Sequence, residues 1–270
     1  MNRSAAALVL VGSLPMALAA QGRYTRTRGD TLRYREVTTA DITLDAAQGP
    51  IKVTSEQESQ LAVTFAGRDS ARAWYESLLL SASSPQGTTT PGTESLKRQP
   101  FHLRLTARGA VTLLAAPAMP AEVAAITDLT HQFDDFFLRL PAGTLTRGRS
   151  WRDTVTLGDS TGAKWYLVRR EARYTVLRDT VVAGTRALVI IMQQALTLAS
   201  GGPVANQPVR TAQRLVGSDS GTVIFSPATG RMLARARSGM LTGTMEITQL
   251  SGVITLPQRY TFESRIERLP

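Results

Sequence analysis

The stretch TLRYREVTTADITLDAAQGPIKVTSEQESQLAVTFAG, residues 31–67, decides the fold class expected for this chain. Apolar and polar residues alternate within it in short runs, and turn residues such as Gly49-Pro50 separate the runs about every ten residues. The runs are residues 31–37, 40–46, 51–56 and 60–67. This pattern predicts an antiparallel meander in which each strand buries one of its two faces.

The same pattern continues toward the C-terminus. Residues 68–81 fit either a helix or a strand by their spacing, and we favour a strand because the neighbouring elements are strands. Residues 83–100 are rich in Thr, Pro, Ser and Gly and predict a polar loop. Hairpins are predicted at residues 101–115 and 154–179, and a strand pair or one long bent strand at 185–198. Single strands are predicted at 209–216, 221–225, 231–238, 243–250 and 259–269.

One segment, residues 117–141, has a different pattern. Pro120 suits the first turn of a helix and Pro141 ends it. Apolar residues recur between them at helical spacing, namely Val123, Ile126, Leu129, Phe133, Phe136, Phe137 and Leu140. A helix with one apolar face has to cover a sheet or plug the mouth of a barrel. The expected fold is therefore mainly β, one or more curved antiparallel sheets or a half-barrel, with one covering amphipathic helix at about residues 120–140.

The first residues predict export from the cytoplasm. Arg3 precedes an uninterrupted apolar run, and Ala17-Leu18-Ala19 fits the small-x-small rule for signal-peptidase cleavage. The expected organisation is a signal peptide (1–19), an N-terminal β region (20–116), a covering helix with its connector (117–141) and a C-terminal β region (142–270). The two β regions form one unit or two lobes. We expect the mature protein in the periplasm or outside the cell, with no transmembrane segment, because it lacks a run of roughly 20 apolar residues.

The amino-acid composition of the chain excludes several kinds of function. The absence of cysteine excludes disulfides, thiol chemistry and a lipidated N-terminal cysteine. The formal net charge is +10, but the arginines are scattered and lack the interleaved aromatics that grip single strands, so we expect no nucleic-acid partner. The densest arginine groups are Arg147, Arg149 and Arg152, and then Arg169, Arg170 and Arg173. We interpret them as a solvated basic surface.

Few residues suggest catalysis or metal binding. Gly158-Asp159-Ser160-Thr161-Gly162 matches the G-x-S-x-G nucleophile motif, but a strand-like run follows where that motif needs a helix, which favours a hairpin turn. The chain has two histidines, His102 and His131. His131 lies three residues before Asp134 and four before Asp135, but no third metal ligand is evident, and we interpret the group as a solvated helix face. We expect neither a metal nor a cofactor.

Phe133, Phe136 and Phe137, together with Trp151, form the densest aromatic group. They suit an ordinary core in which a helix packs on a sheet, or the lining of an apolar cavity. If a cavity exists, these four residues are its predicted lining. They are the candidate ligand-binding residues of this chain.

The run FDDFFLRLPAGTLTRGRSWRDTV (133–155) resembles a recurring segment of uncharacterised secreted β-rich bacterial proteins, a family of unknown function. VAGTRAL (182–188), FSPATGRM (225–232) and YTFESRIERL (260–269) resemble the same family, so the likeness covers most of the mature chain in short pieces. It implies a β-rich fold and transfers no catalytic residue. The expected architecture is also distantly similar to the outer-membrane lipoprotein carrier fold, which holds acyl chains in a concave face; this is an analogy of architecture alone.

Three functional hypotheses follow. The first is a secreted or periplasmic non-enzymatic module that binds a hydrophobic or amphipathic ligand such as a lipid, which predicts a concave apolar pocket of about 300–1,000 Å³. The second is a structural or protein-interaction component of the cell envelope, which predicts an exposed apolar patch or an open sheet edge. The third is a serine hydrolase using Ser160, which requires His102 or His131 within hydrogen-bond reach.

Overall fold

The computed structural model describes residues 22–67, 69–159, 164–204 and 207–270. The predicted signal peptide, residues 1–19, lies outside these ranges. The elements are β1 (Thr31–Ala46), β2 (Gly49–Phe65), β3 (Ser70–Ser84), β4 (Gly87–Thr89), η1 (Glu94–Leu96), β5 (Phe101–Leu105), β6 (Val111–Ala115), α1 (Ala121–Ala124), η2 (Gln132–Asp135), β7 (Ser150–Asp159), β8 (Trp165–Val182), β9 (Thr185–Pro203), β10 (Arg210–Ser226), β11 (Arg231–Gln249) and β12 (Gly252–Arg268).

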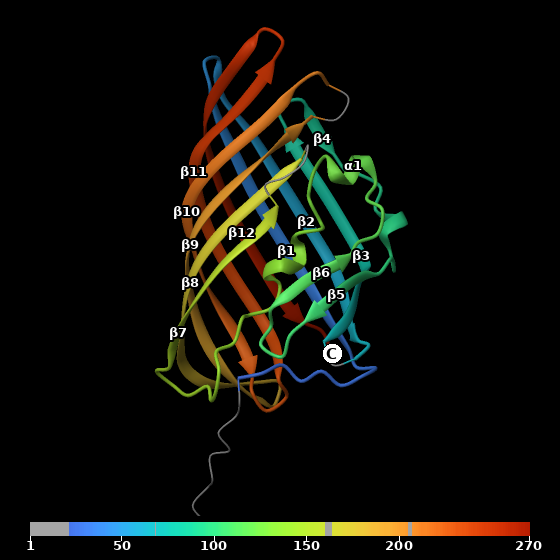
Figure 1. Cartoon of the computed structure of the whole chain (residues 1–270), viewed down its shortest axis with the longest axis vertical. Helices are drawn as coiled ribbons and strands as arrows, with labels where there is room; N and C mark the ends of the chain where they lie inside the picture. Colours follow the sequence, from blue (N-terminus) through green and yellow to red (C-terminus); the bar gives the residue numbers. More distant parts are fainter. Residues whose placement is uncertain (1–21, 68, 160–163, 205–206) are drawn as a thin grey trace, which may run out of the picture.

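All the strands belong to one antiparallel twelve-stranded sheet, which confirms the predicted fold class. Its order is β6-β5-β3-β2-β1-β12-β11-β10-β9-β8-β7, and the short β4 pairs with β3 beside this path. The first strand pairs with the last along eleven aligned positions, from Tyr34 with Arg268 to Leu44 with Gln258. The sheet curves into an unclosed half-barrel (Figure 1), whose free edges are β6 and β7.

Several strands are longer than the sequence predicts. The two runs at 31–37 and 40–46 form the single strand β1, and the runs at 209–216 and 221–225 form β10. The runs at 231–238 and 243–250 lie mainly in β11. The glycines and small polar residues that resemble turns between these runs lie inside continuous strands. Strand is confirmed for residues 70–81, within β3, and the 101–115 hairpin is confirmed as β5 and β6.

Glycines allow neighbouring strands to approach closely where the sheet bends. A Cβ atom added at Gly217 on β10 would lie 2.0 Å from the backbone oxygen of Met240, and one at Gly239 on β11 would lie 2.6 Å from the Cβ of Asp219. Neither distance is compatible with a side chain larger than hydrogen. The absence of a side chain at these two positions therefore permits the close approach of β10 and β11.

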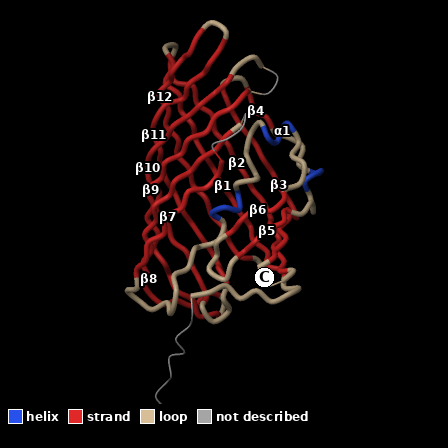
Figure 2. Tube along the Cα trace, in the orientation of Figure 1, coloured by secondary structure: helices blue, strands red, loops and turns tan. Residues whose placement is uncertain are grey.

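The segment predicted as a long helix covers the concave face but is mostly irregular (Figure 2). Only α1 and the 3₁₀ turn η2 are helical within it, so a continuous helix at 120–140 is wrong. Beyond the end of α1, Oδ1 of Asp128 accepts a hydrogen bond from the backbone N–H of Thr130 at 2.9 Å, a local alternative to helical pairing. The apolar spacing of the segment reflects contact with the curved sheet, to which its chain conforms without a regular period.

The inward positions of the sheet change in character along the barrel axis. Along β11 they run from Met232, in the apolar core, through Arg235 and Arg237 to Leu241. Along β8 they run in the opposite direction, from Tyr166 through Arg170 to Val176. The interior is therefore layered: an apolar core at one end, a charged layer in the middle, and a second apolar layer near the other end.

Candidate functional site

The three predicted phenylalanines lie in the filled end of the half-barrel. Phe133, Phe136 and Phe137 are almost fully buried and belong to the main core. The Phe136 ring meets that of Tyr34 edge-on with 5.3 Å between centroids, and the Phe137 ring meets that of Tyr24 at 5.4 Å. These contacts fix the covering segment to the sheet. Their predicted role in lining a ligand cavity stays a prediction.

Trp151 lies on β7 at the margin of that core. Its ring stacks on Tyr174 with 5.1 Å between centroids, and its indole N–H donates a hydrogen bond to the backbone oxygen of Arg139 at 3.0 Å. Trp151 therefore links the edge strand β7 to the covering segment. Like the phenylalanines, it lies apart from the cavity described below.

The centre of the charged layer is the carboxylate of Asp135, which η2 presents to the sheet. Its Oδ2 accepts a hydrogen bond from Nη1 of Arg237 at 2.6 Å, and its Oδ1 is in contact with Nη1 of Arg170. The Arg170 side chain is only 2% exposed, and burial lowers its pKa. A buried guanidinium requires a counterion, and Asp135 supplies one carboxylate for two of them.

Arg235 and Glu36 face each other in the same layer. Arg235 donates a hydrogen bond to the backbone oxygen of Asp135, and burial, reinforced by the neighbouring Arg237, lowers its pKa to about 9. Burial also raises the pKa of the Glu36 carboxyl, against the lowering effect of Arg235 and of a hydrogen bond from the Gln132 amide. The covering segment thus supplies Gln132 and Asp135, and the sheet supplies the groups that they bind.

Asp219, on β10, is the remaining carboxylate of the charged layer. Its carboxylate is fully enclosed, and burial raises its pKa, although Nη1 of Arg237 lies 3.7 Å away. Neither carboxylate oxygen has a hydrogen-bond partner among the described residues. The same holds for Nε and Nη2 of Arg170 and for Nε of Arg237. Buried donors and acceptors without partners are costly, so the layer has capacity for a further polar group or water.

A cavity of about 370 Å³ opens on this layer from the concave side of the sheet. Arg170, Arg235 and Arg237 lie at its polar end, with Glu36 and Asp135. Its apolar lining comes from inward positions of five strands: Leu157, Tyr166, Val168, Leu196, Leu198, Leu241, Tyr260 and Phe262. The Arg237 guanidinium lies 5.3 Å from the centroid of the Phe262 ring, so the polar and apolar parts of the lining are in direct contact.

The covering segment supplies the remaining side of the cavity through His131. Its ring stacks on Tyr166 with 4.4 Å between centroids, and its Nδ1 lies 2.9 Å from Oδ2 of Asp134. This hydrogen bond raises the pKa of His131, against the effect of partial burial. His131, Asp134 and Asp135 are therefore not a solvated helix face: the first two form a pair beside the cavity, and Asp135 turns to the buried arginines.

Sequence reasoning missed the charged layer. It placed Arg170 on a solvated surface with Arg169 and Arg173, which are indeed exposed. The signal was available in the strand period, because Arg170 shares the alternation of Val168 and Tyr174. An arginine in phase with apolar residues predicts an inward charge, whose partner then has to come from another element.

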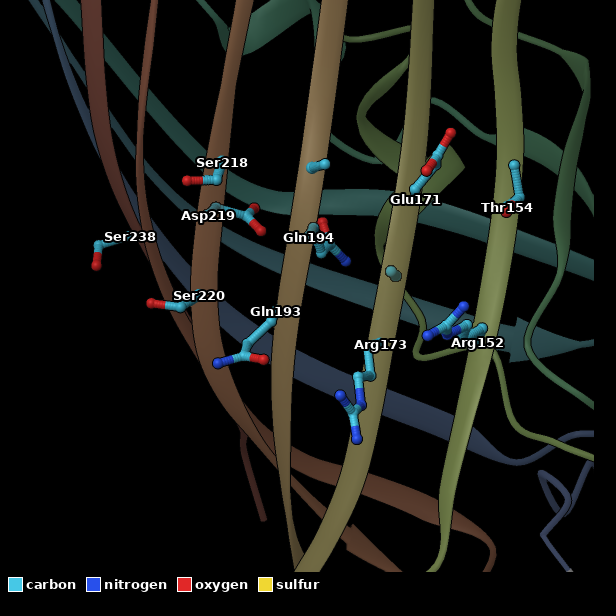
Figure 3. Close-up of a pocket in the computed structure, with 12 residues that line it drawn as sticks. Arg152, Thr154, Glu171, Arg173, Gln193, Gln194, Ser218, Asp219, Ser220 and Ser238 are labelled. Carbon is cyan, nitrogen blue, oxygen red and sulfur yellow. The ribbon is translucent and has the colours of Figure 1, made fainter.

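A second, shallower hollow lies on the outer face of the sheet (Figure 3). Its volume of about 600 Å³ exceeds that of the inner cavity, but it is lined by exposed residues including Arg152, Arg173 and Gln193. Gln194 and Asp219 of the same strands are buried and point inward. A small ligand on this open surface would keep most of its contact with water, so the inner cavity is the better candidate site.

Ser160, the predicted hydrolase nucleophile, lies outside the described residues. His102 is half-buried on β5, where it pairs with Ala115 and Arg72. His131 forms the contacts given above. Among the described residues, no group of three or more His, Cys, Asp or Glu side chains is placed to hold a metal ion. No helix within the described ranges is long and apolar enough to cross a membrane.

Comparison with known proteins gives a likeness of fold alone. No protein-family model matches the chain, and neither does any curated protein. Among solved structures, lipovitellin is similar over 91% of this chain and 26% of its own, with 10% identity and a TM-score of 0.51. The chain thus corresponds to about a quarter of lipovitellin. At this identity the similarity shows a shared arrangement of strands.

Two outer-membrane channels are similar at a lower level. OccK2 of Pseudomonas aeruginosa matches over 91% of this chain and 100% of its own, with 8% identity and a TM-score of 0.25. The COG4313 channel of Pseudomonas putida F1 matches over 90% and 97%, with 10% identity and a TM-score of 0.20. Scores at this level carry no argument about fold or function.

Proposed function

We propose that the protein is an exported, non-enzymatic module that binds one amphipathic molecule in the cavity of its half-barrel. The apolar part of the ligand contacts the wall that includes Leu198 and Phe262. Its head group, a carboxylate or a phosphate, contacts Arg170 and Arg237. The single observation that carries this proposal is the meeting of an apolar wall with buried guanidinium groups in one cavity.

The volume and the chemistry of the cavity both support this assignment. Its volume of about 370 Å³ lies toward the lower end of the range for small-molecule sites, roughly 300–1,000 Å³. Arg170, Arg235 and Arg237 all line this cavity, so an anionic head group there would lie beside guanidinium groups where water is partly excluded. A neutral alcohol supplies weaker acceptors, so the site should prefer an acid with the same chain.

Two further considerations agree with the proposal. The fold is shared with lipovitellin, whose solved structure concerns lipid–protein interactions. The N-terminal sequence predicts export, which would place the module where it meets envelope lipids.

The first test combines native mass spectrometry with titration. Mature protein purified without detergent should carry an extra mass that extracts into organic solvent. Stripped protein should bind a fluorescent long-chain carboxylic acid more tightly than the alcohol of equal length. Leu198→Gln should weaken this binding by about tenfold, because it places an amide in the apolar wall. Leu177→Gln, at an exposed position on β8, is the matched control and should bind normally.

Two outcomes would overturn the proposal. One is a clean apo mass together with no saturable binding of the acid. The other is equal affinity of the Leu198→Gln and Leu177→Gln proteins, which would show that the probe binds outside the cavity. Equal affinity for acid and alcohol would leave the apolar wall in place but remove the arginines from head-group recognition.

The open edges of the sheet favour a second candidate, a protein-interaction module of the cell envelope. Val111 on β6 and Val155 on β7 line the same groove, of about 710 Å³, between the two free edges. An unpaired edge offers backbone hydrogen bonds to an added strand. The test is a pull-down from envelope extracts with wild-type protein and with Thr156→Pro, which removes an edge N–H. Capture by both proteins equally would exclude pairing at β7.

A further inference from the structure

The β11–β12 hairpin ends in an exposed apolar tip. Leu250, in the turn, is 96% exposed, and Val253 and Ile254, at the start of β12, are 62% and 48% exposed. Exposed aliphatic side chains are common singly, but a group of three at the end of a projecting hairpin is not needed for folding. Figure 1 shows this hairpin reaching the upper end of the molecule.

A strip of apolar residues connects this tip to the cavity. Inward positions alternate along both strands, so the face that carries Leu241 and Tyr260 in the cavity also carries the paired residues farther out. These pairs are Met245 with Leu256 and Ile247 with Ile254. The intervening pair is Gly243 with Gln258. The outward positions between them are occupied by Thr244, Glu246 and Thr248.

We propose that the tip of the β11–β12 hairpin docks on a lipid bilayer and that the strip behind it is the path by which the ligand moves between bilayer and cavity. The docking rests on the tip alone, and the path rests on the proposed function. Leu250 and Val253 enter the boundary between head groups and acyl chains, as interfacial anchors do. The strip then extends the apolar surface of the membrane to Met245 and Leu256, which the Gly243–Gln258 pair separates from Leu241 and the cavity.

The charge of the protein favours a lipid surface over a protein partner at this tip. The chain carries a formal net charge of +10. From the level of Thr242 outward, the exposed charged residues of β1, β2, β10, β11 and β12 comprise four basic and two acidic side chains. They are Lys52, Arg210, Arg214 and Arg259, with Asp45 and Glu246. Basic side chains beside an apolar tip are attracted to anionic head groups while the tip inserts. A small aliphatic tip without aromatic residues lacks the anchors typical of a protein–protein hot spot.

The experiment measures co-sedimentation of the full mature chain with vesicles. One set is phosphatidylcholine, and the other is phosphatidylcholine with phosphatidylglycerol. The test variant is Leu250→Asp with Val253→Asp. The matched control is Val181→Asp, because Val181 is 64% exposed on β8 near the opposite end of the sheet. All of these positions are exposed, so the fold should tolerate each change.

Wild-type protein and Val181→Asp should bind vesicles, with higher affinity for the anionic set, and the tip variant should bind at least about tenfold more weakly. Solution binding of the fluorescent acid should be unchanged in the tip variant, which separates docking from the cavity. Absence of wild-type vesicle binding, or equal loss in the tip variant and Val181→Asp, would overturn the docking. Vesicle binding without solution binding of the acid would refute the cavity function and leave the docking supported.

Discussion

Arg237 and Asp219 lie diagonally across β11 and β10, with 3.7 Å between Nη1 and Oδ2, and each is paired in register with a glycine. Gly221 lies opposite Arg237, and Gly239 lies opposite Asp219. A Cβ at Gly239 would lie 2.6 Å from the Cβ of Asp219 and 2.7 Å from the ring of Phe262. The glycines therefore make the space in which the two charged side chains meet beside the cavity.

Gly239→Val should destabilise the protein by about 1–3 kcal/mol, because the new side chain would overpack the bend. The measurement is the midpoint of urea unfolding, compared at unchanged slope. Ser238→Val, at the neighbouring exposed position, is the control and should stay within about 0.5 kcal/mol of wild type. A Gly239→Val protein as stable as its control would show that the bend does not depend on this close approach.

Asp135→Asn should cost about 3–5 kcal/mol of stability, because Arg170 and Arg237 would then share no charged partner on the covering segment. Asp134→Asn changes the adjacent carboxylate, whose contact is with His131, and should cost about 1 kcal/mol or less. Denaturant unfolding of both variants checks the difference. Equal losses would mean that Asp135 is not the organising counterion of the charged layer.

The strand pattern was predictable from sequence because the period of two is strong where one face is buried, as in β1 and β5. The continuity of β10 and β11 was not predictable from the sequence. The run Ser218-Asp219-Ser220-Gly221 has the composition of a turn, yet it lies within β10 because its glycine and its buried aspartate fit the bend beside β11. Local composition does not contain the neighbouring strand that decides this outcome.

The same limit applies to the covering segment and the site. Phe133 and Phe137 were correctly identified as an apolar cluster with a buried face, but the irregular path of their chain follows the sheet that they contact. Arg170 carried a readable signal in its alternation. Asp135 carried none, since only the folded chain brings it to Arg170 across the barrel. Residue periodicity predicts which side chains point inward, and it does not predict which ones meet.

Glu36→Gln should alter how stability depends on pH. The pKa of Glu36 is raised in the folded state by burial, so the folded protein binds a proton more tightly than the unfolded chain does. This contribution to stability is present below the unfolded pKa and is lost as pH rises through the folded pKa. Relative to wild type, Glu36→Gln should therefore gain stability over the pH range above about 4, the pKa of the unfolded carboxyl.

The measurement for Glu36→Gln is the unfolding free energy of both proteins across this pH range. Glu58→Gln changes an exposed carboxylate on the outer face that pairs with Arg35, and it is the control for removing one carboxylate outside the charged layer. A constant difference between wild type and Glu36→Gln over the whole range would contradict the raised pKa.

Phe137→Ala and Phe262→Ala should separate the core from the ligand site. Phe137 contacts Tyr24 and Phe136 in the filled end of the barrel, so its truncation should cost about 3–5 kcal/mol of stability. At a temperature where both variants remain folded, affinity for the fluorescent acid should be unchanged in Phe137→Ala.

Phe262 lines the cavity beneath Arg237, so Phe262→Ala should weaken binding by about tenfold and cost less stability. The reverse pattern would place the ligand among the phenylalanines of the covering segment and away from the arginine-lined cavity.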